Sequence, residues 1–573
     1  MKKLKKLVTF VLATIMSCSF VACQPANNGP SGPGGNILDE EVDPDKFQLN
    51  VSTYDGGYGT AWLGEIKKRY EALHANDVFE GGKKGVQVSV HPVKVPAGNI
   101  PASVLDGIDH VYFTEWAYYY ELLAKGVLGD ITEAVTGDLG GYGDPAGTTI
   151  ASKLTEHQDQ YYNVNGHYYG IPHYAGYGGL TYNKRFFDEQ NLYFAKTPSS
   201  DGSLAGKFIT DANPTKSAGP NGVSGDYDDG LPATYDEFFL LCDFICFRGT
   251  PIMLTGATYK AYANYLTKSL AADYEGLDQM MLNYTFDGTA TNLATISQSG
   301  NIVLDSKDTE ITEENGYEVS RQAGKAYALQ FIQKLLTYGD NKYMVDTFDD
   351  GLTSHTTAQE KFLGSVYDGH PYAMLIDGIW WQSEATQAFS DLAYEAGDEF
   401  SKDGSDFAWM PLPKATPEKV GEGITLFDHI YSLCFMKNGL TGEARDLAID
   451  FIKFCNTQES LVEFTQVTGT PKALTYTMSN DEMAGLNSYC KSILNIKNQP
   501  TTKIVYPYAS SKFYQVNQNP VSNLFVSRVS GSEYSYEAEI FVTTNYSVKD
   551  YFDGIYSYRQ SKWSSWKGLA DAS

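Results

Sequence analysis

The chain has 573 residues, of which 42% are apolar, 14% aromatic and 20% charged. This is the composition of a soluble globular protein, and it excludes a disordered, collagen-like or polytopic membrane chain. The length allows two to four domains of about 100–200 residues. Because the formal net charge is −27, the surface repels phosphate backbones and anionic lipids, so we expect no nucleic-acid partner.

The first 22 residues have the order of a secretory signal peptide. Four lysines precede an apolar run from Leu7 to Ala22, which is shorter than the roughly 20 residues that span a bilayer. Phe20 to Cys23 resembles the lipobox of bacterial lipoproteins, with phenylalanine in the place of the usual leucine-like residue, and this resemblance implies lipidation of Cys23. Residues 23–45 then form a tether rich in glycine, proline and asparagine. We therefore expect an exported protein, lipid-anchored to the outer face of the cytoplasmic membrane and touching the membrane only through this anchor.

Strand and helix patterns alternate through the first part of the body. An alternating strand leads into a Gly-rich turn at 54–59, and amphipathic helices separate the strands that follow. This alternation predicts right-handed crossovers and a mostly parallel sheet. The expected elements are strands at Phe47–Thr53, Val86–Val90 and Ile108–Phe113, and helices at Ala61–Leu73, about 98–106 and Glu115–Lys125.

Helical patterns dominate the rest of the chain. A stretch rich in Gly, Ser, Pro and Asp at 196–233 predicts a surface insertion. Within it, Asp226 to Gly230 loosely resembles a calcium loop, although a solvated acidic turn is the preferred interpretation. Further elements are expected as helices at Tyr235–Phe247, Tyr259–Ala271, Ala323–Leu336, Glu443–Cys455 and Val548–Trp566, and strands at Tyr372–Ile376 and Ile430–Met436.

No motif in the sequence indicates a catalytic or metal site. GxSxG, HExxH, GxGxxG and Walker loops are absent, and the nine histidines are scattered without metal-ligand spacing. We expect no cofactor, no metal ion, no catalytic residue and no essential disulfide. One enzymatic alternative stays open: Glu115 and Asp377 could face each other across a cleft, as the two carboxylates of a glycoside hydrolase do.

A series of short motifs, in a specific order, extends over about residues 46–475. They are Val51 to Gly59, Asp109 to Phe113, Leu122 to Ile131, Asn165 to Pro172, Gly179 to Asp188, Pro232 to Phe238, Gly369 to Trp380, Met410 to Pro413 and Gly469 to Pro471. In these motifs the chain resembles the extracellular solute-binding proteins of bacterial carbohydrate ABC transporters, the family of maltose-binding protein.

The resemblance implies an α/β, two-lobed fold of the periplasmic-binding-protein type (type II), with a ligand cleft between the lobes. Residues 46–173 plus 426–470 would form lobe 1, and residues 174–425 plus 471–573 would form lobe 2. In open sheets, ligands bind beyond the carboxyl ends of the strands, and closure of two lobes around a ligand is the expected motion. The insertions near 196–233 and 280–320 and the tail after 475 depart from the family pattern.

Eight side chains are the expected ligand contacts. Tyr54 and Asp55, Glu115 and Trp116, and Asp377 and Trp380 follow predicted strands, and Tyr174 and Tyr177 lie where the chain crosses between lobes. A carboxylate can accept hydrogen bonds from neighbouring sugar hydroxyls, and an indole can cover the apolar face of a sugar ring.

Each of these assignments has a structural alternative. Asp55 could stabilise the turn, Trp116 could be a core aromatic at a helix start, and Tyr174 and Tyr177 could simply pack the hinge. Trp380 and Trp381 would point about 100° apart at the start of a helix, so only one can face a ligand. Asp428 and His429, near the second crossing, are weaker candidates.

The sequence therefore predicts a binding protein and not an enzyme. It would capture a neutral sugar or oligosaccharide and deliver it to the permease subunits of an ABC importer. The alternatives are a surface glycan-binding lipoprotein without a transporter and a secreted glycoside hydrolase.

Overall fold

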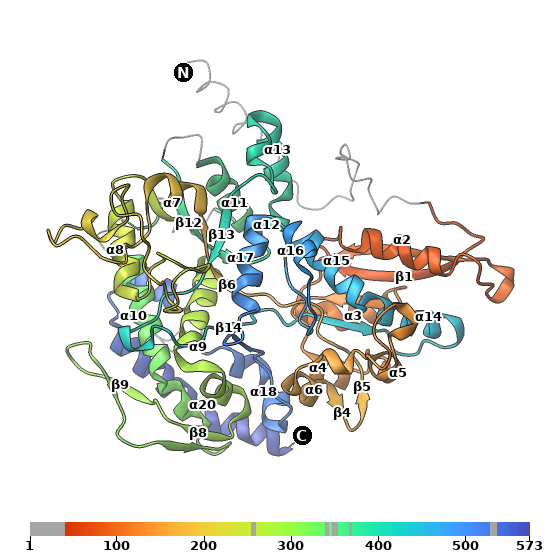
Figure 1. The fold of residues 1–573 in the computed structure, drawn as a ribbon. Helices are drawn as coiled ribbons and strands as arrows, with labels where there is room; N and C mark the ends of the chain where they lie inside the picture. Colours follow the sequence, from red (N-terminus) through yellow and green to blue (C-terminus); the bar gives the residue numbers. More distant parts are fainter. Residues whose placement is uncertain are drawn as a thin grey trace. The chain divides into compact units, whose positions relative to one another are not determined.

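Two four-stranded sheets organise the part of the chain that the structure describes (Figure 1). The structure is a computed structural model, and it describes residues 41–253, 259–337, 343–345, 353–365, 370–527 and 536–572. Residues Val42–Ser573 form one compact unit. The predicted signal peptide, Cys23 and most of the tether lie outside the described residues.

The first sheet has the strand order β15-β3-β1-β2. Its strands are β1 (Phe47–Tyr54), β2 (Val86–Val93), β3 (Val111–Thr114) and β15 (Leu433–Met436). Strand β1 is parallel to both β2 and β3, with Val51 opposite Val90 and Val111. Strand β15 comes from the distant C-terminal part of the chain and pairs antiparallel with β3, so that Cys434 lies opposite Phe113.

The second sheet has the order β13-β6-β12-β7. Its strands are β6 (Gly178–Asn183), β7 (Thr250–Met253), β12 (Tyr372–Gly378) and β13 (Phe407–Met410). Only β12 and β7 are parallel, whereas β6 pairs antiparallel with both β12 and β13. The mostly parallel sheet predicted for the first part of the body is confirmed by the first sheet. The second sheet is mostly antiparallel, which the sequence does not show, because the apolar pattern marks a buried strand but does not record its direction.

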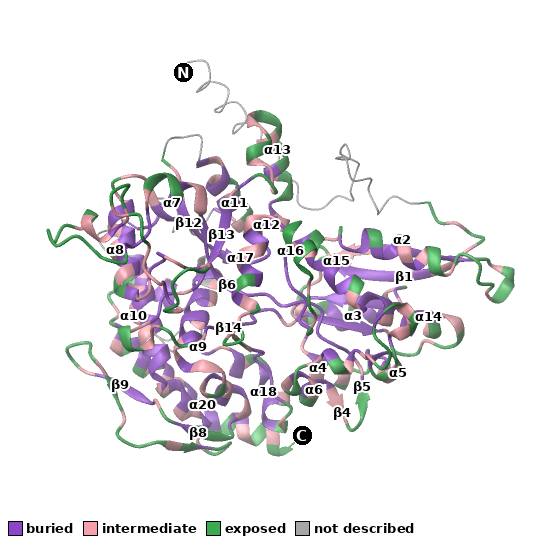
Figure 2. Ribbon diagram, viewed as in Figure 1, coloured by how far each residue is buried: buried purple, intermediate pink, exposed green. Residues whose placement is uncertain are grey.

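Helices cover both sheets, whose strands are mostly buried (Figure 2). In the first half of the chain they are α2 (Leu63–Leu73), α3 (Ile100–Asp106), α4 (Tyr119–Ala124), α5 (Thr132–Thr136), α6 (Glu156–Tyr162), α7 (Lys184–Gln190), α8 (Tyr235–Ile245) and α9 (Tyr259–Thr285). In the second half they are α10 (Ala323–Thr337), α11 (His355–Gly364), α12 (Trp381–Glu384), α13 (Thr386–Ala396), α14 (Gly442–Cys455), α15 (Gln458–Thr468), α16 (Asn480–Ala484), α17 (Ser488–Lys497), α18 (Lys512–Ser522), α19 (Glu537–Thr543) and α20 (Val548–Ala572).

Short strands complete the fold outside the two sheets. The two hairpin-like pairs within 288–311 fall in the stretch that the sequence predicts as an insertion, and β14 pairs with β16 beside the second sheet. These strands are β4 (Asn163–Val164), β5 (His167–Tyr168), β8 (Gly288–Ala290), β9 (Ala294–Ile296), β10 (Ile302–Leu304), β11 (Thr309–Ile311), β14 (Thr425–Phe427) and β16 (Lys503–Val505).

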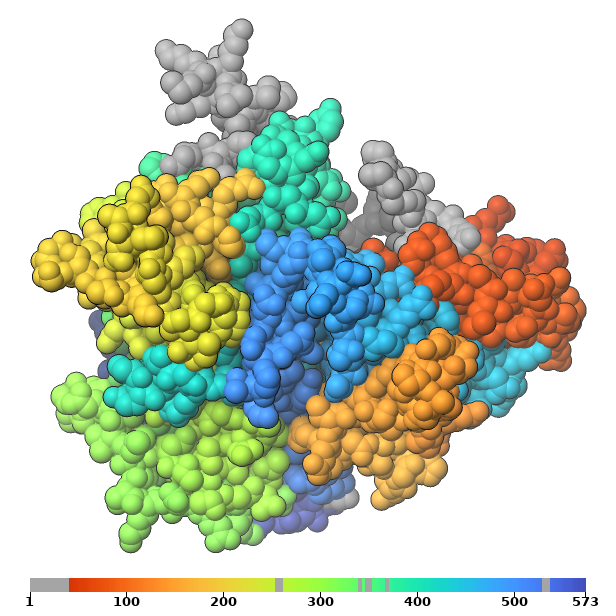
Figure 3. Space-filling model, viewed as in Figure 1, coloured from red at the N-terminus to blue at the C-terminus, as the bar shows by residue number. Residues whose placement is uncertain are grey.

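The Gly- and Asp-rich stretch at 196–233 lies at the surface (yellow in Figure 3). Its acidic turn is not wholly solvated as predicted, since the Asp228 side chain is buried and accepts the backbone N–H of Asn221 at 3.0 Å. Burial raises the pKa of Asp228 to about 8. The neighbouring residues fold over this carboxyl because backbone N–H groups in the turn need an acceptor.

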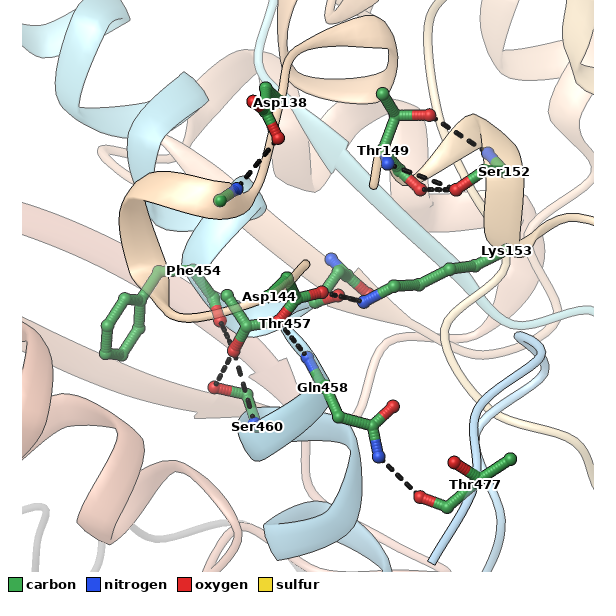
Figure 4. A network of polar contacts seen from close by, with 12 residues as sticks. Asp138, Asp144, Thr149, Ser152, Lys153, Phe454, Thr457, Gln458, Ser460 and Thr477 are labelled. Atoms are coloured by element: carbon green, nitrogen blue, oxygen red, sulfur yellow. Dashed lines mark hydrogen bonds and ion pairs between the residues drawn. The ribbon is translucent and has the colours of Figure 1, made fainter. Parts of the chain in front are cut away.

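A polar network ties Asp144 and Lys153 to the turn between α14 and α15 (Figure 4). The ammonium group of Lys153 donates to Asp144 Oδ2 at 2.8 Å and to the carbonyl of Asn456 at 2.7 Å. The other oxygen of Asp144 accepts the backbone N–H of Gln458 at 2.8 Å, at the start of α15. The aspartate thus neutralises a buried lysine and satisfies an N-terminal helix N–H at the same time.

A second buried ion pair, Lys414–Asp273, should be essential for the packing of α9 beside β14. Lys414 Nζ lies 2.9 and 3.0 Å from the two carboxylate oxygens of Asp273 and 3.1 Å from the carbonyl oxygen of Gly423. We expect Lys414→Met to lower the free energy of unfolding by about 3–5 kcal/mol, because it leaves a buried carboxylate unpaired. Urea denaturation measures this loss.

The control for that experiment is Lys125→Met, which breaks the exposed pair with Glu121. It should cost about 1 kcal/mol or less. The double variant Lys414→Met/Asp273→Leu should recover part of the stability, since no charge is then left unpaired. Equal stability of Lys414→Met and Lys125→Met would contradict the assignment.

Candidate functional site

Strand β1 delivers Tyr54 and Asp55 to the edge of the first sheet. Tyr54 is half-buried, and burial together with the nearby carboxylates of Glu115 and Glu384 raises its pKa to about 12. Asp55 is exposed, and among the described residues its side chain accepts no backbone N–H of the turn. The turn that follows brings Gly57 (φ +47°) close to Glu115, where a Cβ on this glycine would lie 3.2 Å from Oε1. A glycine is needed here both for the backbone conformation and for the close approach.

Strand β3 delivers Glu115 and Trp116 to the same edge. Glu115 is only 5% exposed, and its Oε1 accepts the hydroxyl of Tyr174. Burial raises its pKa to about 8, while the Tyr174 hydrogen bond acts in the opposite direction. The glutamate is thus held in a dry environment, and Tyr174 is its hydrogen-bond partner among the described residues.

Trp116 does not begin a helix, in contrast to the predicted helix at Glu115–Lys125. It has φ +56°, in the left-handed region that non-glycine residues rarely adopt, and α4 begins only at Tyr119. The backbone N–H of Ala117 instead donates to the carbonyl of Tyr431 at 2.8 Å, so the segment after β3 is held by the chain that leads into β15. A sequence pattern does not show this long-range bond.

The two neighbouring indoles after β12 lie in different environments. Trp381 is fully buried and packs among Phe362, Phe407 and Tyr489 inside the second half of the molecule. Trp380, 6% exposed, contacts Tyr265 instead.

Gly378 is the last residue of β12. A glycine is required at this position, since a Cβ here would lie 2.2 Å from the Trp380 ring. The absence of a side chain at this position therefore leaves room for the indole.

Asp377 belongs to a polar network behind Trp380. It is 2% exposed and accepts a hydrogen bond from Gln359 Nε2 at 3.0 Å. Burial, together with repulsion from Glu384, raises its pKa to about 7. Burial alone would raise the pKa of Glu384 as well, but hydrogen bonds from His355 at 3.1 Å and Gln359 at 2.9 Å hold it below its usual value.

Tyr174 and Tyr177 are both buried where the chain passes between the two sheets. The Tyr174 hydroxyl reaches Glu115, whereas the Tyr177 hydroxyl is buried without a hydrogen-bond partner. Gly176, between them, packs so closely that a Cβ would lie 2.3 Å from Ile430 and 3.1 Å from Trp380. Tyr174 therefore belongs to the candidate site through its bond to Glu115. The lack of a side chain at Gly176 lets Ile430 and Trp380 pack against the backbone beside Tyr177.

Five of these side chains lie together with Tyr265 of α9. The Trp116 and Tyr265 ring centroids are 6.4 Å apart with planes 20° from parallel, and the Tyr265 and Trp380 rings are 6.3 Å apart and nearly perpendicular. Gly57 lies close to both Glu115 and Trp380, since a Cβ at this position would be 3.2 Å from Glu115 Oε1 and 3.7 Å from the Trp380 ring. We call this group the aromatic–acidic cluster; its members are Tyr54, Glu115, Trp116, Tyr174, Tyr265 and Trp380.

The sequence interpretation missed Tyr265 and its neighbours. Tyr262 and Tyr265 stand three residues apart on α9 and therefore on one face, a spacing that could have marked them. Glu384, with its partner His355, comes near Tyr54 and Glu115 only in the folded chain, because α12 and α11 lie far from β1 and β3 in the sequence. His429, a weaker candidate, is buried with its ring 4.6 Å from Tyr265 and its Nε2 3.0 Å from the Ser269 hydroxyl.

The described residues contain no group of three or more His, Cys, Asp and Glu side chains placed to hold a metal ion. Within the same residues, no helix is both long enough and apolar enough to cross a membrane.

Comparison with known proteins identifies the fold. The chain matches a chitin oligosaccharide binding protein with a TM-score of 0.51 and 13% identity, over 90% of this chain and 99% of that chain. It also matches a mannobiose-bound binding protein of an ABC transporter from Bifidobacterium animalis subsp. lactis, with a TM-score of 0.52 and 11% identity, over 94% and 100% of the two chains. No protein-family model matches the sequence. No curated protein matches it either.

The chain therefore has the α/β fold of periplasmic solute-binding proteins, and the predicted fold class is confirmed. Identities this low establish the fold alone. The lobe boundaries and the ligand contacts stay predictions.

The raised pKa of Glu115 gives a pH-dependent test of the site. The carboxyl group has a higher pKa in the folded chain than in the unfolded chain. Between these two pKa values only the folded chain holds the proton, so the stability falls as the pH rises through this range. Wild type should lose about 1.4 kcal/mol per pH unit relative to Glu115→Gln between about pH 5 and 8. Thermal unfolding of both proteins across this range measures the difference.

The control is Glu121→Gln, at an exposed glutamate of α4. Its stability should change with pH in the same way as that of wild type. If the stability of Glu115→Gln also changes with pH as wild type does, Glu115 is not held in a dry environment.

Proposed function

We propose that this protein is the substrate-binding lipoprotein of an ABC importer and captures a neutral sugar or oligosaccharide between its two lobes. The observation that carries the proposal is the aromatic–acidic cluster, in which Trp116, after β3 of the first sheet, and Trp380, after β12 of the second, both pack against Tyr265. Indole and phenol faces cover the apolar faces of sugar rings, and the carboxyl of Glu115 can hydrogen-bond with hydroxyl groups.

The arrangement of the cluster suits a binding protein that closes on its ligand. A ligand that contacts Trp116 and Trp380 at once favours the closed arrangement, because its contacts to both halves exist together only in that state. The Ser383 hydroxyl of α12 donates to the carbonyl of Thr468 in α15, which would be one direct contact between the proposed lobes in the closed state. The proposal assigns no catalytic step to this chain; the permease subunits would receive the ligand from the closed form.

The proposal includes export and attachment to the outer face of the cytoplasmic membrane through Cys23. It rests on the sequence of residues 1–45 and on the class of fold. The lobes are proposed as residues 46–173 plus 426–470 and residues 174–425 plus 471–573, with Tyr54, Asp55, Glu115, Trp116, Tyr174, Tyr177, Asp377 and Trp380 as ligand contacts.

Removal of the indoles should weaken sugar binding. A thermal-shift screen against mono- and oligosaccharides first identifies a ligand, and calorimetry then measures its affinity. Trp380→Ala and Trp116→Ala should each lower the affinity by about 1–3 kcal/mol, which is 5- to 150-fold, because each loses an aromatic face against the ligand. Tyr394→Ala, at a side chain 92% exposed on α13, should not change it. Unchanged affinity in both tryptophan variants would contradict the site.

Ligand binding should also compact the protein. Small-angle scattering should show a smaller radius of gyration with the identified sugar than without it, because the ligand favours the closed arrangement. A sugar that binds without changing the radius would favour the alternative of a surface glycan-binding platform.

A further inference from the structure

Four helices, together with the short helix η6 (Gly316–Arg321), enclose two buried cationic side chains. Helices α9, α10, α18 and α20 contact one another in this region (Figure 1). Arg559 of α20 is 1% exposed and Lys325 of α10 is 0% exposed. Buried charges in proteins are normally paired with an opposite charge, so two buried cations in one region require an explanation.

Arg559 lacks the partners that a buried guanidinium normally has. Its Nη1 donates to the carbonyl of Val521 at 3.3 Å, while Nε and Nη2 are buried with no hydrogen-bond partner. Its other contacts are with indole faces, at 6.0 Å from the Trp563 ring and 5.7 Å from the Trp566 ring. No carboxylate of the described residues lies within ion-pair distance of this group.

Lys325 is also held by neutral groups. Its ammonium group donates to Asn283 Oδ1 at 2.5 Å and to the carbonyl of Val319 at 2.8 Å. The nearby carboxyl is that of Glu275, whose oxygens accept the N–H of Gly324 and the amide of Asn292. Burial, and after it the positive charge of Arg559, lower the pKa of Lys325 well below its usual value.

The other buried unpartnered atoms on these helices and η6 include the amide oxygen and nitrogen of Gln518 on α18 and two hydroxyl groups that can donate hydrogen bonds. The Tyr284 hydroxyl at the end of α9 is buried without a partner, and Arg559 acts on it electrostatically. The hydroxyl of Ser320, next to Val319, is buried and unpartnered as well. A set of free donors around two positive charges is what an anion requires, whereas a neutral water molecule would leave the charges uncompensated.

We infer that Arg559, Lys325 and Tyr284 form a binding site for a small monovalent anion such as chloride. The anion would accept hydrogen bonds from Nε and Nη2 of Arg559 and from the Tyr284 hydroxyl, and it would offset the repulsion between the two cations. Because α20 is the last described helix, the anion would fasten it to α9, α10 and α18. The site is separate from the aromatic–acidic cluster and does not depend on the proposed function.

Thermal unfolding in chloride and gluconate salts at equal ionic strength tests the inference. The melting temperature of wild type should rise by about 3 °C or more between 2 and 200 mM chloride, and less in gluconate, because gluconate is too large for a buried site. Arg559→Met should abolish the chloride-specific rise and Tyr284→Phe should reduce it. Arg445→Met, which removes an arginine paired with Glu133 on the surface, should retain it.

A crystal grown or soaked in sodium bromide gives a second readout that does not require the variants to fold. An anomalous peak beside Arg559 Nε and Nη2 is expected. Equal responses to chloride and gluconate in wild type, the same chloride response in Arg559→Met, or ordinary water density at the position would each overturn the inference.

Discussion

The pairing of β15 with β3 is the constraint on which the rest of the molecule depends. It returns the chain to the first sheet after the whole second sheet has been built, so two segments must pass between the sheets side by side. They are fastened to each other by Ile171 and Cys434, whose backbones exchange hydrogen bonds of 2.9 and 2.8 Å, and by the N–H of His429 on the carbonyl of Gly176. Two segments joined in this way would form the hinge of the two lobes proposed above.

These crossing segments also determine the chemistry of the aromatic–acidic cluster. Tyr174 on the first crossing donates to Glu115, and Asp428 on the second accepts the N–H of Gly176 at 3.0 Å. Burial raises the pKa of both carboxyl groups to about 8. Carboxyl groups in so dry an environment act through hydrogen bonds, which suits recognition of an uncharged, hydroxyl-rich ligand.

The buried lysine and arginine side chains have different kinds of partner in different parts of the molecule. Lys153 and Lys414 each have an aspartate at hydrogen-bond distance. Lys472, in contrast, bonds to His173 at 2.7 Å and lies 4.3 Å from the centre of the Phe464 ring, and burial lowers its pKa to about 7. Arg559 has no anionic partner among the described residues. The paired lysines join distant segments, and the unpaired cations are the positions where a proton or an anion changes the stability of the fold.

The sequence alone determined most element positions and the types of residue at the strand ends, because period-2 and period-3.6 patterns and strand-end positions are local properties. The fold class came from the resemblance of its ordered motifs to a known family. Strand direction in the second sheet, the left-handed backbone of Trp116 and the role of Tyr265 were decided only by the tertiary structure. Each depends on a contact between residues far apart in the chain: β6 with β13, Ala117 with Tyr431, and α9 with both tryptophans. A local pattern shows which face of an element is buried, but only the packed chain shows what that face is buried against.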